Sequence, residues 1–353
     1  MFQTKRGQPN VLGRRLVQKS HRMNSVFCFL ASWIRGAAQG CSGLARRPAV
    51  GLALLFAWLL AAQADTAAPL RYKVATYNLE NYLDQPKGTR RAKSEVSKGQ
   101  VRRTILKLAP DILALQELGG LSAMTELQSS LERDGLAFAH RELVQGWDTN
   151  IFIGVLSRYP ITARRPHTNE TFVLNGRRLH VSRGFAEVDI QIRDGYQLTL
   201  ITAHLKSKRN AYEIDEADWR EQEAIKLREV VDRRLAENPA VNLVVLGDLN
   251  DTPDSKPIRK VIGRGKQALV DSKPAERNGD DYVEENGRYP ARRVEWTHYY
   301  GKEDTYSRID YILMSRGLAA EWVRAGTYIL SIPNWGLASD HRPIIAEFEA
   351  VDR

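Results

Sequence analysis

The sequence predicts a mixed α/β fold, and three observations support this prediction. Short apolar runs recur along the chain and have the length and the Val, Ile and Leu content of buried strands. Two longer segments carry apolar residues at helical spacing. From Asp65 to Arg353 there is no internal repeat, no low-complexity block and no long linker, so we expect residues 65–353 to form a single domain.

The apolar runs are the expected strands. Some are continuously apolar, as in strands buried on both faces, and others alternate apolar and polar residues. In chain order they are Lys73–Leu79, Ile112–Gln116, Ile151–Leu156, Gly184–Ile192, Leu198–His204, Leu243–Leu246, Ile309–Met314 and Ile344–Phe348.

The two expected helices each end shortly before a proline. The first covers about Ser97–Leu108 and precedes Pro110, and the second covers about Glu216–Glu237 and precedes Pro239. Each carries one apolar stripe, which predicts one buried face. The segment Lys273–Arg293 is rich in charge, Gly, Pro and Asn, and is expected to be a long surface loop.

The formal net charge of +10 comes almost wholly from the first 64 residues, which hold nine of the 52 Lys and Arg and none of the 42 Asp and Glu. Arg46 and Arg47 precede an apolar run at residues 49–62, which ends in the small-residue sequence Ala62-Gln63-Ala64, the order of a secretory signal peptide. We therefore expect residues 1–64 to be a leader cleaved after Ala64. The alternative is a membrane anchor, but the run is shorter than the roughly 20 residues that span a bilayer.

Export by this leader predicts a secreted or periplasmic protein without a stable membrane anchor, and we expect a monomer. Both cysteines, Cys28 and Cys41, lie in the leader. The mature chain would then have no disulfide and no thiol nucleophile, so its stability would depend on the core and on any metal that it binds.

Polar residues stand where the apolar runs end or are interrupted. Strand ends in open α/β sheets are where active sites are assembled. Any one such residue is more often a turn residue or a hydrogen-bonded core histidine, but their joint occurrence favours a site. They are Asn78, Glu117, His204, Asp248, Asn250, Asp310, Asp340 and His341.

These residues belong to sequence blocks that occur in a characteristic order. After TYNLEN, which begins at Thr76, come DILALQE, ITAHLKS, VVLGDLND, SRIDYILMS and SDHRP. Through these blocks the chain resembles the endonuclease/exonuclease/phosphatase family, as an exported bacterial-type member of its deoxyribonuclease I-like branch. The resemblance implies a four-layer α/β/β/α sandwich, two β-sheets packed face to face with helices outside, and hydrolysis of phosphodiester bonds in a cleft at one edge of the sheets.

Phosphodiester hydrolysis requires a cation to neutralise the phosphate, a group that orients or deprotonates water, and donors for the charge that develops on the phosphate oxygens. Oxygen ligands suit Mg²⁺ or Mn²⁺, with Ca²⁺ as a further candidate. The resemblance implies that Glu117 is the principal metal ligand and that Asn78 and Asp340 lie near the ion.

The resemblance also implies the catalytic roles. Asp248 and Asn250, two apart in a segment expected to be extended, would orient the water and hold a phosphate oxygen. Asp310 would hydrogen-bond His341 and fix its tautomer. His204 is a second imidazole, whose counterpart in deoxyribonuclease I-like members contacts or protonates the leaving group. Which imidazole is the base and which is the acid stays open.

Further expectations concern basic and loop residues. Arg158 is expected to approach a substrate phosphate. The run Lys206-Ser207-Lys208-Arg209 either does the same or is a solvated loop. Asp148 either orients His204 or caps its own loop.

Nucleic acid is the substrate that the ITAHLKSKRN and GDLNDTPDS blocks favour, which predicts an endonuclease. The near-neutral charge beyond the leader requires that any nucleic-acid site be locally basic. The alternative is a phosphodiesterase or phosphatase acting on lipid headgroups or small phosphate esters, because sphingomyelinases and inositol-polyphosphate phosphatases share the fold and the SDH block. A binding protein on an inactive fold would lack a catalytic residue, and none is missing.

Overall fold

The computed structural model describes residues 69–208, 215–279 and 293–351. The chain divides into two compact units, Met1–Ala67 and Ala68–Arg353, and the description below concerns the second. The expected leader, its cleavage site and Arg209 therefore lie outside the described residues, as does most of the expected loop Lys273–Arg293. Within the described ranges no helix is both long enough and apolar enough to cross a bilayer.

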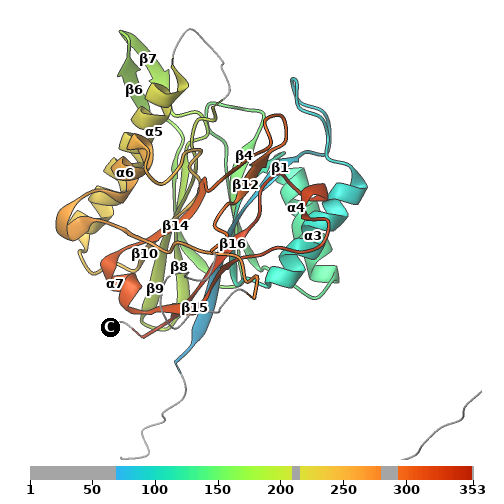
Figure 1. Ribbon diagram of the computed structural model, residues 1–353. Coiled ribbons are helices and arrows are strands. Elements are labelled where there is room, and N and C mark those ends of the chain that lie inside the picture. The colour runs from blue at the N-terminus through green and yellow to red at the C-terminus, as the bar shows by residue number, and fades with distance from the viewer. Residues whose placement is uncertain (1–68, 209–214, 280–292, 352–353) are drawn as a thin grey trace, which may run out of the picture. The chain divides into compact units, whose positions relative to one another are not determined.

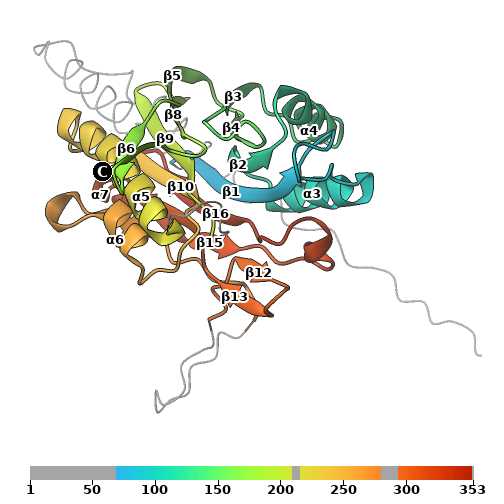
Figure 2. The same ribbon diagram turned by 90° about the horizontal axis from the view of Figure 1, so that it is seen from above.

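Two six-stranded mixed sheets pack face to face between layers of helices, as Figures 1 and 2 show. The first sheet has the order β15 (Trp322–Ile329), β16 (Ile344–Glu349), β1 (Arg71–Tyr82), β2 (Ile112–Leu118), β4 (Phe152–Ser157) and β3 (His140–Val144). The second has the order β11 (Val270–Asp271), β14 (Asp310–Met314), β10 (Leu243–Asp248), β9 (Tyr196–His204), β8 (Phe185–Arg193) and β5 (Ile161–His167). The predicted four-layer sandwich is confirmed.

Helices cover the outer face of each sheet. Helices α3 (Glu95–Leu108) and α4 (Leu121–Arg133) lie on the first sheet, and α5 (Glu216–Glu237) and α6 (Lys256–Ile262) lie on the second (Figure 2). The remaining elements are short: α7 (Arg316–Ala320), the 3₁₀ turns η1 (Gly265–Gln267) and η2 (Trp335–Leu337), and the two hairpins β6 (Thr171–Leu174) with β7 (Arg177–His180) and β12 (His298–Tyr300) with β13 (Thr305–Ser307).

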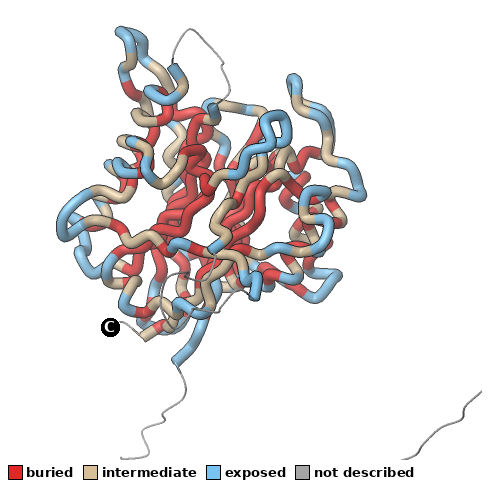
Figure 3. Tube along the Cα trace, in the orientation of Figure 1, coloured by how far each residue is buried: buried red, intermediate tan, exposed pale blue. Residues whose placement is uncertain are grey.

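The core has three apolar layers, because both faces of each sheet are covered. The layer between the sheets includes Val74 and Ile112 from the first sheet and Val188 and Leu246 from the second. Separate clusters join the first sheet to α3 and α4, and the second sheet to α5 and α6. Figure 3 shows the central strands buried along most of their length. Such burial explains why these strands are continuous apolar runs in the sequence.

The topology brings the chemically active strand ends to one edge. Strands β1 and β2 are parallel neighbours, and their register pairs Asn78 with Gln116, the residue before Glu117. Strands β9 and β10 are also parallel, and their register places His204 opposite Asp248. Strand β14 runs antiparallel to β10, which places its first residue, Asp310, on the other side of Asp248.

The approach of β10 to β9 at this edge depends on Gly247. This residue has φ of 135°, and a Cβ atom there would lie 2.0 Å from the carbonyl oxygen of Ala203. Only glycine combines this backbone conformation with this contact. Gly247 therefore allows the strand pairing that sets His204 beside Asp248.

Candidate active site

One oxygen of Asp248 lies at the centre of the strand-end cluster. Its Oδ2 accepts a hydrogen bond from Asn78 Nδ2 at 2.9 Å. The same oxygen is 3.4 Å from His204 Nε2 and 3.7 Å from His341 Nε2. Burial raises the pKa of Asp248 to about 7, with the charge of Asp310 adding to the rise and that of His341 opposing it. This carboxyl group can therefore exchange a proton near neutral pH.

The expected contact between His341 and Asp310 is present. His341 Nδ1 lies 2.9 Å from Asp310 Oδ2, and both side chains are almost fully buried. The backbone N–H of Asp310 donates to Thr297 Oγ1 at 3.1 Å, which holds the start of β14 in place. Burial lowers the pKa of His341, but the carboxylates of Asp310 and Asp248 outweigh it and hold the pKa well above its ordinary value.

The second imidazole, His204, has the opposite electrostatic environment. Burial lowers its pKa well below the ordinary value, and the positive charges of Arg183, His341 and Arg90 lower it further. Its Nδ1 is buried without a hydrogen-bond partner among the described residues. His204 is therefore neutral at physiological pH, and its Nε2 faces Asp248.

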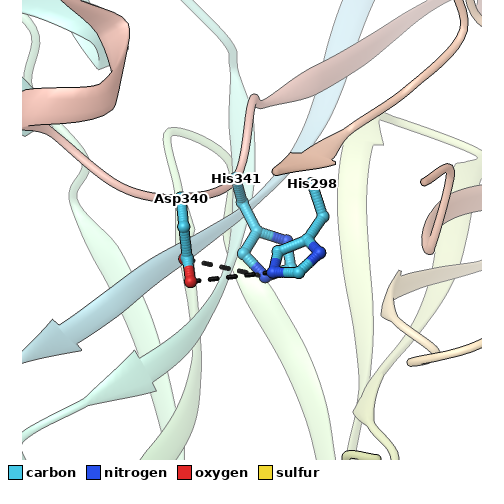
Figure 4. A group of neighbouring side chains, drawn as sticks. All are labelled: His298, Asp340 and His341. Carbon is cyan, nitrogen blue, oxygen red and sulfur yellow. Dashed lines mark ion pairs between the residues drawn. The ribbon is translucent and has the colours of Figure 1, made fainter. Parts of the chain in front are cut away.

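A third imidazole, His298 of β12, also lies at the site. Figure 4 shows His298 and His341 side by side, both facing the carboxylate of Asp340. Their ring centroids are 4.6 Å apart, and His298 Nε2 lies 3.7 Å from Asp340 Oδ2. Burial raises the pKa of Asp340, but the neighbouring imidazoles of His298 and His341 outweigh it and lower the pKa. His298 carries no signal in the sequence, because it comes from a short hairpin with no apolar run before it.

The expected metal ligands occupy the adjoining part of the edge. Glu117 Oε2 accepts from the backbone N–H of Asn81 at 2.9 Å and from Arg90 at 3.3 Å. Asn78 Oδ1 accepts from the backbone N–H of Glu80 at 3.0 Å. Glu80, Asn81 and Glu117 all have positive φ, a conformation that non-glycine residues keep only where the surrounding structure enforces it.

Three carboxylates converge here on a single ammonium group. The charges of Glu80, Asp340 and Glu117 all act on Lys93, whose Nζ lies 3.8 Å from Glu80 Oε2 and donates to the carbonyl of Ala338 at 2.8 Å. Burial raises the pKa of Glu80, and repulsion from Asp340 and Glu117 raises it further.

A divalent cation of the Mg²⁺ or Mn²⁺ type fits this part of the edge, because negative charge is in excess and the donors are hard oxygens. Two groups of described side chains lie close enough to share a cation, and both include His341. One consists of Asp248, Asp310 and His341, and the other of His298, Asp340 and His341. Glu117 belongs to neither group, and the metal-binding role of Glu117, Asn78 and Asp340 stays a prediction.

Asn250 differs from the expected extended geometry. It has φ of 55°, so it does not continue β10 with its side chain parallel to that of Asp248. Its Nδ2 donates to the carbonyl of Leu205 at 2.9 Å, and its backbone N–H donates to Asp248 Oδ1 at 2.9 Å. Asn250 thus ties the end of β10 to the end of β9. Because an amide NH₂ carries two hydrogens, one remains for a further acceptor.

The expectation that Arg158 approaches the substrate phosphate is wrong, because the residue lies at the opposite end of the sheet. Its Nη1 pairs with Asp111 Oδ1 at 2.9 Å, next to the beginning of β2. Glu117 stands six residues further along that strand, about 20 Å away at the rise of an extended chain.

Asp148 and the basic run that begins at Lys206 were each expected to have one of two roles. Asp148 accepts from the backbone and side chain of Asn150 at 3.0 Å, so it caps its own loop. Lys206 is mostly buried, whereas the Lys208 side chain is 60% exposed and lies 3.5 Å from Asp251.

A cleft of about 980 Å³ adjoins the site, and Glu80 and Asn81 form part of its wall. Its lining is mainly polar, with five cations against two carboxylates. The cations are Arg90, Arg91, Lys93, Arg183 and Lys206. Of these, Lys206 alone was expected from the sequence, because the others come from loops whose spacing carries no signal.

Comparison with known proteins indicates the same family as the sequence motifs. The profile of the Endonuclease/Exonuclease/phosphatase family matches residues 75–341, whereas no curated protein matches the sequence. The human Nocturnin catalytic domain matches with a TM-score of 0.55 and 17% identity, over 80% of this chain and 97% of that one. Truncated TDP2 from Caenorhabditis elegans matches with a TM-score of 0.53 and 18% identity, over 80% and 98% of the two chains. Sphingomyelinase C from Streptomyces griseocarneus matches with a TM-score of 0.53 and 18% identity, over 79% and 100%.

At these identities the solved structures show a common fold alone. The family profile, in contrast, spans most of the chain and includes every strand that contributes to the site. Strand order, the convergence of polar strand ends and the profile all agree. The chain therefore belongs to the endonuclease/exonuclease/phosphatase family.

Proposed function

We propose that the protein is an exported, divalent-metal-dependent phosphodiester hydrolase, and specifically an endonuclease. The observation that carries the proposal is the buried arrangement in which His341 lies between Asp310 and Asp248, with further carboxylates beside it. Enzymes of this family hydrolyse phosphoester bonds. Export rests on the signal-peptide pattern of residues 1–64.

The residues of the chain account for the movement of protons. Because the Asp310 carboxylate is an acceptor, it holds a proton of His341 at Nδ1 and leaves Nε2 facing Asp248. The Asp248 carboxyl lies between two imidazoles and can orient a water or pass a proton between them. Neutral His204 presents Nε2 to the same carboxyl group. Depending on its tautomer, this nitrogen can accept a proton from Asp248 or return one to it.

Two of the carboxylates that act on Lys93 are candidate metal ligands. Glu117, Asn78 and Asp340 would hold the ion, and His298, whose Nε2 lies 3.7 Å from Asp340 Oδ2, would help to position that carboxylate. A bound Mg²⁺ or Mn²⁺ would polarise the phosphate and stabilise the negative charge of the transition state. The remaining amide hydrogen of Asn250 can contact a phosphate oxygen without breaking the bond to Leu205.

Two features support nucleic acid over other phosphodiesters. The cations of the cleft make one face locally basic, as a nucleic-acid site requires in a chain that is near neutral beyond residue 64. The cleft is also open and polar, which suits a strand more than an acyl chain.

A substrate panel tests the proposal. Single-stranded and duplex DNA, RNA, bis-p-nitrophenyl phosphate and sphingomyelin are each incubated with the mature protein, with Mg²⁺ and with EDTA. We expect the protein to cleave nucleic acid at internal positions of the strand and to hydrolyse the nitrophenyl diester. Both reactions should occur with Mg²⁺ and should not occur with EDTA. Hydrolysis of sphingomyelin with no cleavage of nucleic acid would overturn the endonuclease assignment, and no hydrolysis of any diester would overturn the proposal itself.

A further inference from the structure

The cleft beside the site carries an exposed aromatic ring that the proposed chemistry does not use. The Trp147 side chain is 66% exposed and lies in the loop between β3 and β4. Its ring stacks on His180, the last residue of β7, with centroids 4.0 Å apart and planes within 2°. Because most of the indole is exposed, His180 supports it from one side and the other face is open.

This loop is fixed against the rest of the cleft. The backbone of Gly146 packs so closely on Arg183 that a Cβ atom would lie 2.2 Å from the Arg183 carbonyl carbon. The N–H of Asp148 donates to the carbonyl of Ser182 at 2.6 Å. The indole is therefore held in position before any ligand binds, which lowers the entropy cost of using it as a contact.

Cationic side chains line the same cleft as the indole. Arg183 is 5% exposed and lines the cleft, and its Nη1 donates to the carbonyl of Leu205, the residue after His204. Its Nε has no hydrogen-bond partner in the described part of the chain and lies 3.8 Å from Asp148. Arg90, Arg91 and Lys93 form another part of the lining, which also includes Glu80.

A stacking surface and cations in one cleft match the chemistry of an unpaired base on a phosphate backbone. A duplex does not fit, because its bases already stack on one another and cannot cover the indole. We propose that the cleft binds a single strand of DNA or RNA, with the base of a nucleotide flanking the scissile phosphate on Trp147 and adjacent phosphates on the cations. This inference rests on the proposed endonuclease function and adds the strand preference and the base-binding residue.

The test separates the base from the backbone. Binding is measured in EDTA, where turnover does not occur, with a fluorescein-labelled hexathymidylate and with an abasic tetrahydrofuran hexamer of the same charge. The proteins are the wild type, Trp147→Ala, Trp147→Phe and Arg91→Ala. Tyr306→Ala is the matched control, because Tyr306 is 53% exposed but does not line the cleft.

We expect Trp147→Ala to weaken binding of hexathymidylate by about tenfold and to remove most of the preference over the abasic strand, as loss of one stacked base does. Trp147→Phe should keep most of that preference, and Tyr306→Ala should keep all of it. Arg91→Ala should weaken both strands alike and reduce the log–log salt slope by about 1.

An unchanged preference in Trp147→Ala would overturn the base site, as would equal binding of both strands by the wild type. Tighter binding of duplex than of single strands would also overturn it. These outcomes differ from failure of the proposed function. That failure would appear as no diester hydrolysis in Mg²⁺, regardless of how tightly the protein binds the strands in EDTA.

Discussion

At the scale of single residues, the cluster depends on His341 and Asp310, which lie in different strands or loops and meet only in the folded chain. Their contact is buried, and the backbone N–H of Asp310 donates a hydrogen bond to Thr297 Oγ1. A histidine with one nitrogen fixed by a carboxylate presents the other in a defined state. This arrangement makes the two residues one chemical unit.

His341→Ala and Asp310→Ala should therefore each lower turnover by about 10²-fold or more, and the double variant should lose far less than the product of the two losses. The measurement is turnover per folded molecule, with circular dichroism melts to correct for unfolded protein. Multiplicative losses in the double variant would show that the two side chains act independently. A lowered melting temperature with normal turnover of the folded fraction would make His341 a structural residue.

Sequence reasoning could find the site residues that stand at the ends of apolar strands. Glu117, His204 and Asp248 are visible because each interrupts or follows an apolar run, and parallel neighbours must end at one edge. His298 and Lys93 are not visible, because only long-range folding brings their loops to that edge. Asn250 was found but its geometry was not, since a left-handed residue after a strand has no apolar periodicity to reveal it.

At the scale of elements, the buried carboxylate of Glu187 joins two strands and a helix. Glu187 of β8 accepts hydrogen bonds from Arg165 and His167 of β5 and from Arg234 of α5. Burial raises the pKa of Glu187, but these hydrogen bonds outweigh it and lower the pKa to about 2. The ionised carboxylate therefore stabilises the attachment of α5 to the edge of the second sheet.

Glu187→Gln should lower the free energy of unfolding by about 1–3 kcal/mol at pH 7, because it removes an acceptor of charged hydrogen bonds. The folded-state pKa lies below the ordinary value, so this stabilisation is complete above about pH 4.5 and is lost as the pH falls toward 2. Urea denaturation of both proteins from pH 7 to pH 3 measures the difference, which should shrink below pH 4.5.

Glu229→Gln is the matched control, because this residue of α5 is 47% exposed and its one ion pair within the described ranges is with Lys226 on the same helix. It should change the free energy of unfolding by less than about 0.5 kcal/mol at every pH. A difference between wild type and Glu187→Gln that grows as the pH falls would contradict the assigned direction of the pKa shift.

Helices were predictable where a capping side chain and a following proline mark their ends, and strands were predictable where a continuous apolar run marks them. Helices α3 and α5 each follow a capping side chain, Ser94 and Asp215, and each precedes a proline. Helix α4 has neither sign, because it begins after Gly120 with no side-chain cap and follows β2 directly. The half-exposed edge strand β15 and the charged β5 also lack the continuous apolar runs of the central strands.

At the scale of the whole molecule, the sandwich holds the candidate ligands on separate parts of the fold. Asn78 and Glu117 end neighbouring strands of the first sheet, whereas Asp340 precedes β16 and meets His298 from a hairpin. The class of fold was predictable because buried strands and ordered motifs extend over the whole domain. The cleft was not, because it is formed by loops from distant parts of the sequence.

Because these ligands come together only in the folded state, binding of Mg²⁺ should stabilise the entire domain. A ligand present at 100 times its Kd adds about 2.7 kcal/mol to the free energy of unfolding if it binds only the folded state. Differential scanning calorimetry of chelator-dialysed protein, with and without Mg²⁺ or Mn²⁺, measures this effect without reference to any substrate. Glu117→Ala should reduce the rise in Tm, whereas Asn250→Ala should keep the rise and lower turnover. The same dialysed protein should be inactive until the ion is restored. Full activity of metal-free protein would show that turnover does not depend on the ion. Equal rises in Tm for wild type and Glu117→Ala would show that Glu117 is not a ligand of that ion.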